Sequence, residues 1–343
     1  MPRQPAPPRT AVLPRITLVG PGNLANALAA ALHIAGYVIE AIVASGRAGS
    51  LRRARILAKK VGALAVTAEQ SAIHAEVVWF CVPDGAIAGA AKTLKPTADW
   101  TGKIALHSSG ALSSDELATL RRAGAAVASA HPLMTFVRRS RIQQPGVQQP
   151  GVRQPRVRQT RVRQTRARQT RVGQSTAPLA GVPFAMEGDK MAVRAARRIV
   201  KHLGGESCAI RKHDKAAYHA WASFASPLLT ALLVTSEQVA AAAGLRPAVA
   251  KKRMLPMIRQ TLANYAAWGG SAAFSGPIVR GDAATIKRHL DSLRTDRIAG
   301  NVYRSLVRAA VAYLPGKNKK MVRAAVELPK RKGAAPSGVR RKS

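Results

Sequence analysis

Short apolar runs alternate with helix-like stretches through the first 210 residues of the chain. The run at residues 77–82 is apolar without interruption, as strands are when helices cover both faces of their sheet. Strands are predicted at residues 16–19, 37–44, 77–82, 103–106, 126–130 and 183–188. Helices are predicted up to Ile34 and at residues 51–60, 85–94 and 189–203, with Asp84 as the cap of the third. This alternation predicts an α/β fold with a doubly wound parallel sheet.

The pattern changes at Asp214, because nearly all of the remaining chain is helical by its spacing of apolar residues. An all-helical C-terminal domain is therefore predicted, and residues 214–243 are long enough for one central helix. On that helix Lys215, His219, Ala222 and Ser226 share one stripe. If the stripe faces a ligand cleft, its lysine and histidine are candidate proton donors to a carbonyl or imine. If it faces solvent, it is the polar side of an amphipathic helix.

The first predicted strand leads into the sequence G-P-G-N-L-A, which opens the first helix. Gly20 permits a tight turn, Gly22 has no side chain where a pyrophosphate approaches, and Ala25 is small where the helix meets the sheet. Backbone N–H groups at the helix start then face the phosphates. A structural glycine turn is the alternative, but a strand before the motif and a helix after it favour dinucleotide binding.

The end of the second strand distinguishes NADP from NAD, because a basic residue there accommodates the 2′-phosphate and an acidic one binds the ribose. Ser45 and Arg47 occupy this position, and Arg52 and Arg53 follow. Glu40 is acidic but lies in the middle of the strand. The sequence therefore favours NADP(H), with ordinary solvated arginines as the alternative.

Polar clusters follow three of the predicted strands, at the edge where ligands of parallel sheets bind. They are Val82-Pro83-Asp84, His107-Ser108-Ser109-Gly110, and the segment from His131 to Phe136 that includes Thr135. A single histidine is more often structural than catalytic. Two histidines at the same edge make a catalytic role about as probable as a structural one.

The net charge of +39 would ordinarily indicate a nucleic-acid partner. Much of it, however, lies in segments that resemble appendages, including eleven arginines between Arg138 and Arg171. Residues 143–172 repeat every five positions, which matches neither a helix nor a strand and predicts a disordered insertion. A nucleic-acid-binding arm is one interpretation. A tolerated repeat expansion in a surface loop is the interpretation we favour, for the insertion and for the basic tail.

Two cysteines, Cys81 and Cys208, give neither a disulfide framework nor metal-ligand spacing, so no metal is predicted. The N-terminus lacks the apolar core of a signal peptide, and no run of about 18 apolar residues is evident. We therefore expect a cytoplasmic protein with no membrane partner. The predicted regions are a head (1–14), a Rossmann-like domain (15–137), the insertion (138–176), final sheet elements (177–212), a helical domain (213–314) and a basic tail (315–343).

Seven motifs occur in a specific order: G-P-G-N-L-A, C-V-P-D, H-S-S-G-A-L, H-P-L-M-T-F, F-A-M-E-G, K-A-A-Y-H-A and S-G-P-I-V-R-G-D. In this order the chain resembles bacterial proteins that join a Rossmann-like NADP domain to a helical domain of unknown function 2520. The resemblance covers nearly all of residues 15–314 except the insertion. More distantly, the plan is similar to ketopantoate reductase, pyrroline-5-carboxylate reductase and the 3-hydroxyisobutyrate dehydrogenases. The resemblance implies a nicotinamide cofactor and a homodimer, but no particular substrate.

The same resemblance implies roles for individual residues. The glycine motif would hold the pyrophosphate, and Val82, Pro83 and Asp84 would lie beside the nicotinamide ribose. Candidate cofactor-binding residues are Gly20, Pro21, Gly22, Asn23, Leu24, Ala25, Ser45, Arg47, Val82, Pro83, Asp84, His107 and Ser108. Lys215 resembles the lysine of the hydroxyacid dehydrogenases, although His219 replaces the asparagine expected beside it. Pro227 also stands where asparagine is expected, and a proline there kinks the helix.

These observations together predict an NADP(H)-dependent oxidoreductase that reduces a ketone or imine of a small carboxylate-bearing metabolite. Lys215 is the predicted catalytic proton donor, with His219 or His131 as its helper. Substrate anchoring is assigned to Ser108, Ser109, Thr135, Ser226 and Arg280. The alternatives are a non-catalytic NADP-binding module with a nucleic-acid-binding arm, and a degenerate paralogue that binds cofactor without catalysis.

Overall fold

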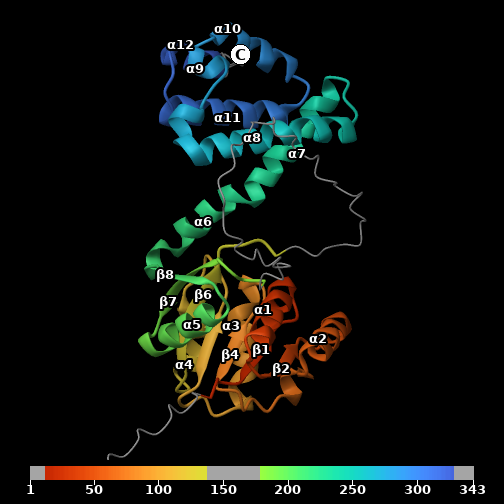
Figure 1. Ribbon diagram of the computed structural model, residues 1–343, viewed down its shortest axis with the longest axis vertical. Helices are drawn as coiled ribbons and strands as arrows, with labels where there is room; N and C mark the ends of the chain where they lie inside the picture. Colours follow the sequence, from red (N-terminus) through yellow and green to blue (C-terminus); the bar gives the residue numbers. More distant parts are fainter. Residues whose placement is uncertain (1–11, 137–177, 328–343) are drawn as a thin grey trace, which may run out of the picture. The chain divides into compact units, whose positions relative to one another are not determined.

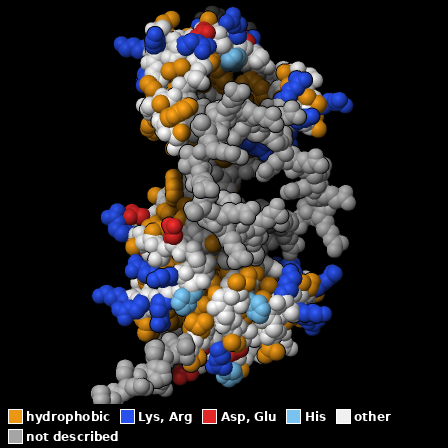
Figure 2. All heavy atoms as spheres, viewed as in Figure 1, with side chains coloured by type: hydrophobic (Ala, Val, Ile, Leu, Met, Phe, Trp, Pro, Cys, Tyr) orange, Lys and Arg blue, Asp and Glu red, His pale blue; other side chains and the backbone are white. Residues whose placement is uncertain are grey.

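The computed structural model describes residues 12–136 and 178–327, which belong to two compact units divided between Ala222 and Ser223. The predicted disordered insertion, most of the predicted head and the last part of the predicted tail lie outside the described residues. Lys and Arg side chains outnumber Asp and Glu on the visible face of each unit (Figure 2).

The first unit is built on one sheet whose strands follow the order β3-β2-β1-β4-β5-β6-β7-β8 (Figure 1). The strands are β1 (Ile16–Val19), β2 (Ile39–Ala44), β3 (Leu64–Thr67), β4 (Val77–Phe80), β5 (Ile104–His107), β6 (Ala126–Pro132), β7 (Pro183–Gly188) and β8 (Glu206–Ala209). The order reverses between β1 and β4, and this reversal is where ligands bind in doubly wound sheets. All six predicted strands are present, which confirms the predicted α/β fold class.

One strand departs from the predicted parallel arrangement. β7 runs antiparallel to β6, while the other neighbouring strands are parallel. Gly188 ends β7 at a φ of 135°, and a Cβ atom there would lie 2.5 Å from the Val127 carbonyl oxygen. Only glycine fits this close approach. The edge strand β8 was not predicted, because its exposed sequence E-S-C-A carries no apolar run.

Helices cover both faces of the sheet and form two separate cores. On one face lie α1 (Asn23–Ile34), α2 (Ala48–Val61) and α5 (Lys190–His202), whose apolar sides pack on β1, β2, β4 and β6. On the other face α3 (Ile87–Leu94) and α4 (Ala118–Arg121) pack on Val78, Phe80 and Val127. Short 3-10 turns connect these elements: η1 (Ala68–Gln70), η2 (Asp84–Ala86), η3 (Lys95–Thr97), η4 (Ser114–Leu117) and η5 (Lys212–Asp214).

Two local predictions were wrong. Asp84 does not cap α3: it opens η2, and its carboxylate accepts a hydrogen bond from Ser109 instead. The single central helix predicted for residues 214–243 is two helices, α6 (Lys215–Ala225) and α7 (Pro227–Ala242). The break is at Ser226, whose φ of −131° and ψ of −80° are not helical. Pro227 explains it, because proline has no N–H to continue the ladder and disfavours helical geometry in the residue before it.

The described residues of the second unit, 223–327, form helices and no strand, in agreement with the predicted helical region. After α7 come α8 (Pro247–Ala273), α9 (Pro277–Arg280), α10 (Ala283–Ser292), α11 (Arg297–Tyr313) and α12 (Lys319–Val326). The predicted basic tail begins too early, because α12 belongs to the packed core. Its Val322 and Val326 are buried against Ile286 and Val307. Lysines and arginines on the exposed side of α12 concealed this amphipathic pattern in the sequence.

Among the described residues, the helical stretch Lys212–Ala242 is long and apolar enough to cross a membrane by length and composition alone. The sequence reading did not identify it. Helices in the cores of proteins that never enter a membrane meet the same criterion.

Candidate functional site

A groove of about 990 Å³ lies in the first unit at the carboxyl ends of β1, β2 and β4. It contains many of the predicted cofactor-binding residues, namely Gly20, Pro21, Gly22, Ser45, Arg47, Val82 and Pro83. The rest of the glycine motif lies in the first turn of α1. Leu24 and Ala25 pack on the sheet core, while Asn23 donates a hydrogen bond from its side chain to the Phe136 carbonyl oxygen at 2.9 Å.

The two glycines of the motif have different physical reasons to be glycine. Gly20 has a φ of 98°, and a Cβ atom there would lie 2.7 Å from Val82 Cγ1 and 2.9 Å from the Cys81 carbonyl oxygen. The fold itself therefore excludes a side chain at Gly20. Gly22 has an extended backbone, with a φ of −81°, and the nearest atom to a Cβ there is 3.6 Å away. Nothing within the described chain requires glycine at this position, whereas a pyrophosphate lying against the backbone would.

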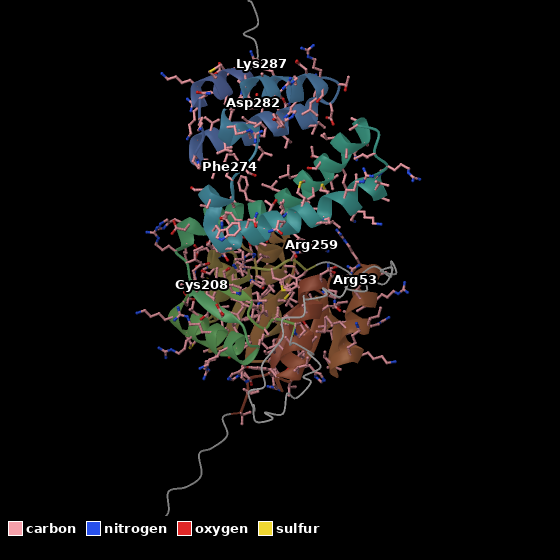
Figure 3. All side chains as sticks on the ribbon, turned by 45° about the horizontal axis from the view of Figure 1, so that its top comes forward. Arg53, Cys208, Arg259, Phe274, Asp282 and Lys287 are labelled. Atoms are coloured by element: carbon pink, nitrogen blue, oxygen red, sulfur yellow. The ribbon has the colours of Figure 1, made fainter. Side chains whose placement is uncertain are left out.

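Two cations border the groove where the sequence predicts a 2′-phosphate. Arg47 precedes α2, and Arg53 projects from it (Figure 3). Both are exposed, and neither forms an ion pair with any described residue. Ser50 accepts a hydrogen bond from the Ser45 N–H at 3.2 Å and so orders the turn between them. The exposed carboxylate of Glu69 also lines the groove, and the sequence reading missed it.

Glu40 lies away from these groups. Its carboxylate accepts the His74 N–H at 3.0 Å and lies 3.5 Å from the Arg15 guanidinium. Both partners precede strands, at the opposite end of the sheet from the groove. Glu40 is thus the second residue of β2, and it lies away from the strand end where an acidic residue would bind the ribose.

Asp84 connects the groove to a cluster of polar side chains. It follows Pro83 of the groove wall, and its Oδ2 accepts a hydrogen bond from Ser109 Oγ at 2.8 Å. The same Ser109 Oγ accepts the backbone N–H groups of Ala111 and Leu112. The adjacent Ser108 accepts a hydrogen bond from the Trp79 indole at 2.8 Å. The loop after β5 is thereby held in one conformation directly beside the groove.

Lys215 is buried against this loop, with 1% of its surface exposed. Its ammonium donates hydrogen bonds to the Ser109 carbonyl oxygen at 3.0 Å and to Ser129 Oγ at 2.7 Å. Burial lowers the pKa of Lys215, while the nearby carboxylates of Glu187 and Asp84 favour its charged form. The lysine is therefore a buried cation whose basicity is reduced, which is a feature of groups that transfer protons.

Two histidines and a tyrosine lie next to Lys215. The His131 ring makes edge-on contacts with the rings of His219 and Tyr218, at centroid distances of 5.7 and 5.8 Å. His131 Nδ1 and the Tyr218 hydroxyl are both buried and have no hydrogen-bond partner among the described residues. Gly110 allows this packing, because a Cβ atom there would lie 2.5 Å from His219 and 2.8 Å from His131. Two buried polar atoms therefore have unused hydrogen-bonding capacity beside a buried ammonium group.

His107 ends β5, and both of its ring nitrogens are used. Nε2 lies 3.0 Å from the Ser113 carbonyl oxygen, and Nδ1 accepts the Ser109 N–H at 3.1 Å. This pairing fixes a neutral imidazole that donates from Nε2. Burial lowers the pKa of His107 to about 4. The pKa of His131 is also lowered to about 4, by burial first and then by the charges of His219 and Lys215.

These two histidines lead to an expected pH dependence of stability. In the unfolded chain the pKa of each is near 6.5, whereas in the folded state it is about 4. The folded state binds fewer protons, so the free energy of unfolding is highest above pH 6.5 and falls as the pH drops toward 4. The expected slope is about 1.4 kcal/mol per pH unit for each histidine. Urea unfolding of His107→Gln between pH 7 and 5 should show about half the wild-type slope, and an unchanged slope would exclude His107 as its source.

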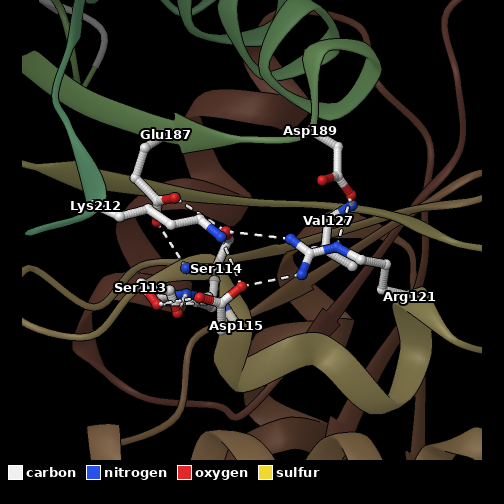
Figure 4. Close-up of polar contacts among 9 residues, drawn as sticks. Ser113, Ser114, Asp115, Arg121, Val127, Glu187, Asp189 and Lys212 are labelled. Carbon is white, nitrogen blue, oxygen red and sulfur yellow. Dashed lines mark hydrogen bonds and ion pairs between the residues drawn. The ribbon is translucent and has the colours of Figure 1, made fainter.

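A network of charged and hydroxyl groups fixes the loop and the start of α6 together (Figure 4). Asp115 accepts hydrogen bonds from Lys212 at 2.6 Å and from Arg121 at 3.0 Å. These partners lower the pKa of Asp115 to about 2. Glu187, 6% exposed, accepts the Ser114 N–H at 2.6 Å and its hydroxyl at 2.9 Å. Because Lys212 lies three residues before Lys215, the network positions the buried ammonium.

Thr135, a predicted substrate residue of the first unit, lines a different pocket, of about 580 Å³, beside α1. Ser226 and Arg280 belong to the second unit and stay predictions. Among the described residues, no group of three or more His, Cys, Asp or Glu side chains is arranged to hold a metal ion.

The sequence reading missed Tyr218, Asp115 and Glu187. Tyr218 had a signal, since it adjoins His219 in the motif K-A-A-Y-H-A. The carboxylates had none, because Glu187 and its partner Ser114 are 73 positions apart in the chain. Such pairs become visible only in the folded structure.

Comparison with known proteins agrees with the geometry of the fold. No curated protein matches the chain. A solved structure of a candidate NADP oxidoreductase from Bacteroides fragilis is 20% identical and matches with a TM-score of 0.64 over 86% of this chain and 97% of its own. A protein from Thermotoga maritima is also 20% identical, with a TM-score of 0.58 over 90% and 98%. A reductive aminase from Aspergillus terreus in complex with NADPH and ethyl-5-oxohexanoate is 14% identical, with a TM-score of 0.56 over 91% and 99%.

At these identities the structural matches support the fold alone. The matches to protein families meet inside the sheet, because the second begins at β7. Residues 5–132 match the Rossmann-like domain, and residues 182–310 match Domain of unknown function (DUF2520). The chain therefore carries a Rossmann-like domain followed by a domain of the DUF2520 family.

Proposed function

We propose that this protein is an NADP(H)-dependent reductase acting on a ketone or imine of a small carboxylate-bearing metabolite. One observation carries the proposal: Asp84, next to Pro83 of the groove wall, accepts a hydrogen bond from the Ser109 hydroxyl, and the Ser109 carbonyl accepts one from the buried ammonium of Lys215. A dinucleotide groove and a proton-donating cluster are thus neighbours in one unit. The same fold occurs in a candidate NADP oxidoreductase and in a reductive aminase, with which the proposal is compatible.

The groove fits NADPH by its own chemistry. Gly22 leaves the backbone at the start of α1 open to the pyrophosphate, and that helix has no acidic residue in its first turn to compete for it. Arg47 and Arg53, which line the groove, would bind the 2′-phosphate, and Val82 and Pro83 would contact the nicotinamide ribose. When bound, NADPH supplies the hydride, so the protein has to align the acceptor and deliver a proton.

Proton donation and hydrogen bonding to the substrate are assigned to Lys215, His131 and Tyr218. Two N–H bonds of the Lys215 ammonium are occupied by Ser109 and Ser129, which leaves the third to polarise and protonate the acceptor oxygen or nitrogen. His131 Nδ1 and the Tyr218 hydroxyl supply hydrogen bonds to other polar atoms of the substrate. The neutral state of His131, caused by its lowered pKa, keeps a second positive charge away from the lysine.

The preference for NADPH over NADH should depend on the two groove arginines. We expect Arg47→Gln/Arg53→Gln to weaken NADPH binding by at least about 100-fold, because each charge-assisted hydrogen bond to a phosphate is worth about 1.5–3 kcal/mol. NADH binding should change by less than about threefold. Titration of both nucleotides by fluorescence measures the ratio. Arg122→Gln is the matched control, because Arg122 is an exposed cation that follows α4 and does not line the groove. Equal weakening of both nucleotides would contradict a 2′-phosphate site.

The reaction class is tested by screening keto acids, imino acids and ketone–amine mixtures with NADPH. A true ligand raises the melting temperature by mass action, and a true substrate also consumes NADPH, which its absorbance follows. We expect at least one carboxylate-bearing compound to do both. If compounds stabilise the protein but none is reduced, the chain binds cofactor without catalysis. If no compound stabilises the protein or is reduced while NADPH is bound, the proposed substrate class is wrong.

The proposal includes a homodimer in the cytoplasm. Within the second unit, α7 has no buried residue and α8 buries only Ala250. Large apolar side chains are exposed along them at Leu228, Val234, Met257, Leu262 and Trp268. Apolar surface of this extent is typical of an interface, and a second copy of the chain would cover it. Light scattering should give twice the mass of one chain; the mass of one chain would contradict the dimer.

A further inference from the structure

The charge of the first unit is distributed unequally across its sheet. Helices α1, α2 and α5, which cover one face, contain no Asp or Glu. Nine of their exposed cations lie outside the groove, and we call them the basic face: Arg52, Arg55, Lys59, Lys60, Lys190, Arg194, Arg197, Arg198 and Lys201. Figure 2 shows such side chains over α5 and α2 in the lower unit.

The opposite face of the same sheet is nearly neutral. Residues 84–103 and 113–122, which form its helices and turns, carry five Lys or Arg and four Asp or Glu. Asp115 pairs there with Arg121 and Lys212. By contrast, no cation of the basic face forms an ion pair with a described residue. The high charge of the chain therefore does not explain the basic face by itself, since one side of the sheet balances its charge and the other does not.

The cations on α5 are spaced so that they repel one another, which lowers the stability of the helix. Lys190, Arg194 and Arg198 follow one another at four-residue intervals, and Arg197 and Lys201 form a second such row. Like charges four residues apart repel each other and destabilise a helix. Intervening acids, which would relieve the repulsion, are absent. A bound polyanion would remove this cost and turn the row into a source of affinity.

We propose that the basic face binds the phosphate backbone of double-stranded nucleic acid, a function beyond reduction of a small metabolite. A membrane-surface helix places Trp, Phe or Leu beside its cations. On α1, α2 and α5 no aromatic side chain is exposed, and the exposed apolar residues are the separated Ile34, Ile56 and Met191. Neither α2 nor α5 carries the Asn or Gln side chains that read adenine. The proposed contacts are between these cations and phosphates, so binding acts through charge.

This surface is distinct from the repeat insertion and the basic tail, because its residues lie on α2 and α5 of the first unit. It is also distinct from the groove, since none of its nine cations lines the groove. Cofactor binding and nucleic-acid binding are therefore separable by substitution.

The test uses the full-length chain and fluorescein-labelled duplexes of DNA and of RNA, each about two helical turns long, with anisotropy measured over a series of KCl concentrations. The face variant is Arg55→Gln/Lys59→Gln/Arg194→Gln/Arg197→Gln/Lys201→Gln. The control variant removes five exposed cations elsewhere: Lys92→Gln/Lys95→Gln/Arg122→Gln/Lys319→Gln/Lys320→Gln. NADPH binding and the melting temperature of both variants report that the groove and the fold persist.

We expect the face variant to bind duplex at least about 10-fold more weakly, and to flatten the plot of log K against log salt by about 0.9 for each phosphate that its cations no longer neutralise. The control variant should change much less on both measures. The two duplexes show which nucleic acid is preferred. Equal weakening in the two variants would overturn the proposal, because affinity would then follow total charge. Weaker binding to phosphatidylserine vesicles with unchanged duplex binding would overturn it in favour of a membrane surface.

Discussion

Replacing Lys215 is expected to lower turnover by about 10²- to 10⁴-fold, the range of a general acid, while NADPH binding changes by less than about twofold. Lys215 lies at the cluster and not among the residues that line the groove, so its replacement removes proton delivery and spares the cofactor. Both Lys215→Ala and Lys215→Met should show this effect. Steady-state kinetics and nucleotide titration measure the two quantities.

The methionine variant separates catalysis from folding. Lys215 is 1% exposed, and its alanine variant leaves a cavity, which lowers stability. Methionine fills the space but leaves the Ser109 carbonyl, the Ser129 hydroxyl and the nearby carboxylates without their cation, so the melting temperature should fall by less than in Lys215→Ala. Turnover should collapse all the same. Lys190→Ala, at an exposed cation of α5, is the control and should leave turnover intact. Normal turnover in Lys215→Met would remove the lysine from the mechanism.

Gly22→Val is expected to weaken NADPH binding by at least about 100-fold, equivalent to about 2.7 kcal/mol, because its side chain would occupy the space of the pyrophosphate. Valine tolerates the extended backbone at Gly22, and the position has no close neighbour in the chain. The cost to folding should be about 1 kcal/mol, from a poorer residue at the helix cap.

Gly20→Val is the matched contrast. Its φ of 98° and the 2.7 Å approach to Val82 Cγ1 make a side chain incompatible with the fold, so we expect a decrease of about 2–4 kcal/mol in the free energy of unfolding. In thermal unfolding Gly20→Val should therefore lose more stability than Gly22→Val. In NADPH titration Gly22→Val should lose affinity while it stays folded. A Gly22→Val protein that binds NADPH normally would show that the motif is only a structural turn.

The first strand–turn–helix unit could be predicted from the sequence because its signals are local. The apolar run at β1, the turn at Gly20 and the small Ala25 adjoin one another, and each suits the fold by itself. Arg47 was also predictable, since its place after β2 follows from the strand's end. Much of the groove is thus encoded within some 30 consecutive residues.

The proton-donating cluster was only half predictable. Lys215, His131 and Ser109 were identified as candidates, but their contacts depend on elements far apart in the chain, since Lys215 and its partner Ser109 are separated by 106 positions. Asp84 shows the same limit, because its local sequence is that of a helix cap and its actual partner is Ser109. In the sequence Tyr218 looks like an ordinary helical tyrosine, and its contact with the His131 ring is visible only in the structure.

Helix continuity and the extent of the second core were the other misjudged features. Pro227 was recognised as a kink, but a proline that begins a new helix and one that bends an existing helix have the same sequence signature. The cationic exposed side of α12 concealed the apolar stripe that packs on α10 and α11. The local sequence did not distinguish one helix from two at Pro227, or a packed helix from a basic tail at α12. Tertiary packing decided both.

The most direct test of this account is titration of the purified full-length chain with NADPH, followed by the fluorescence of the nucleotide and by calorimetry. We expect saturable binding of one NADPH per chain, a smaller affinity for NADH, and disappearance of the signal in Gly22→Val. A titration that fails to saturate, or one that the Gly22 substitution leaves unchanged, would contradict the assignment of the groove and the reductase proposal that depends on it.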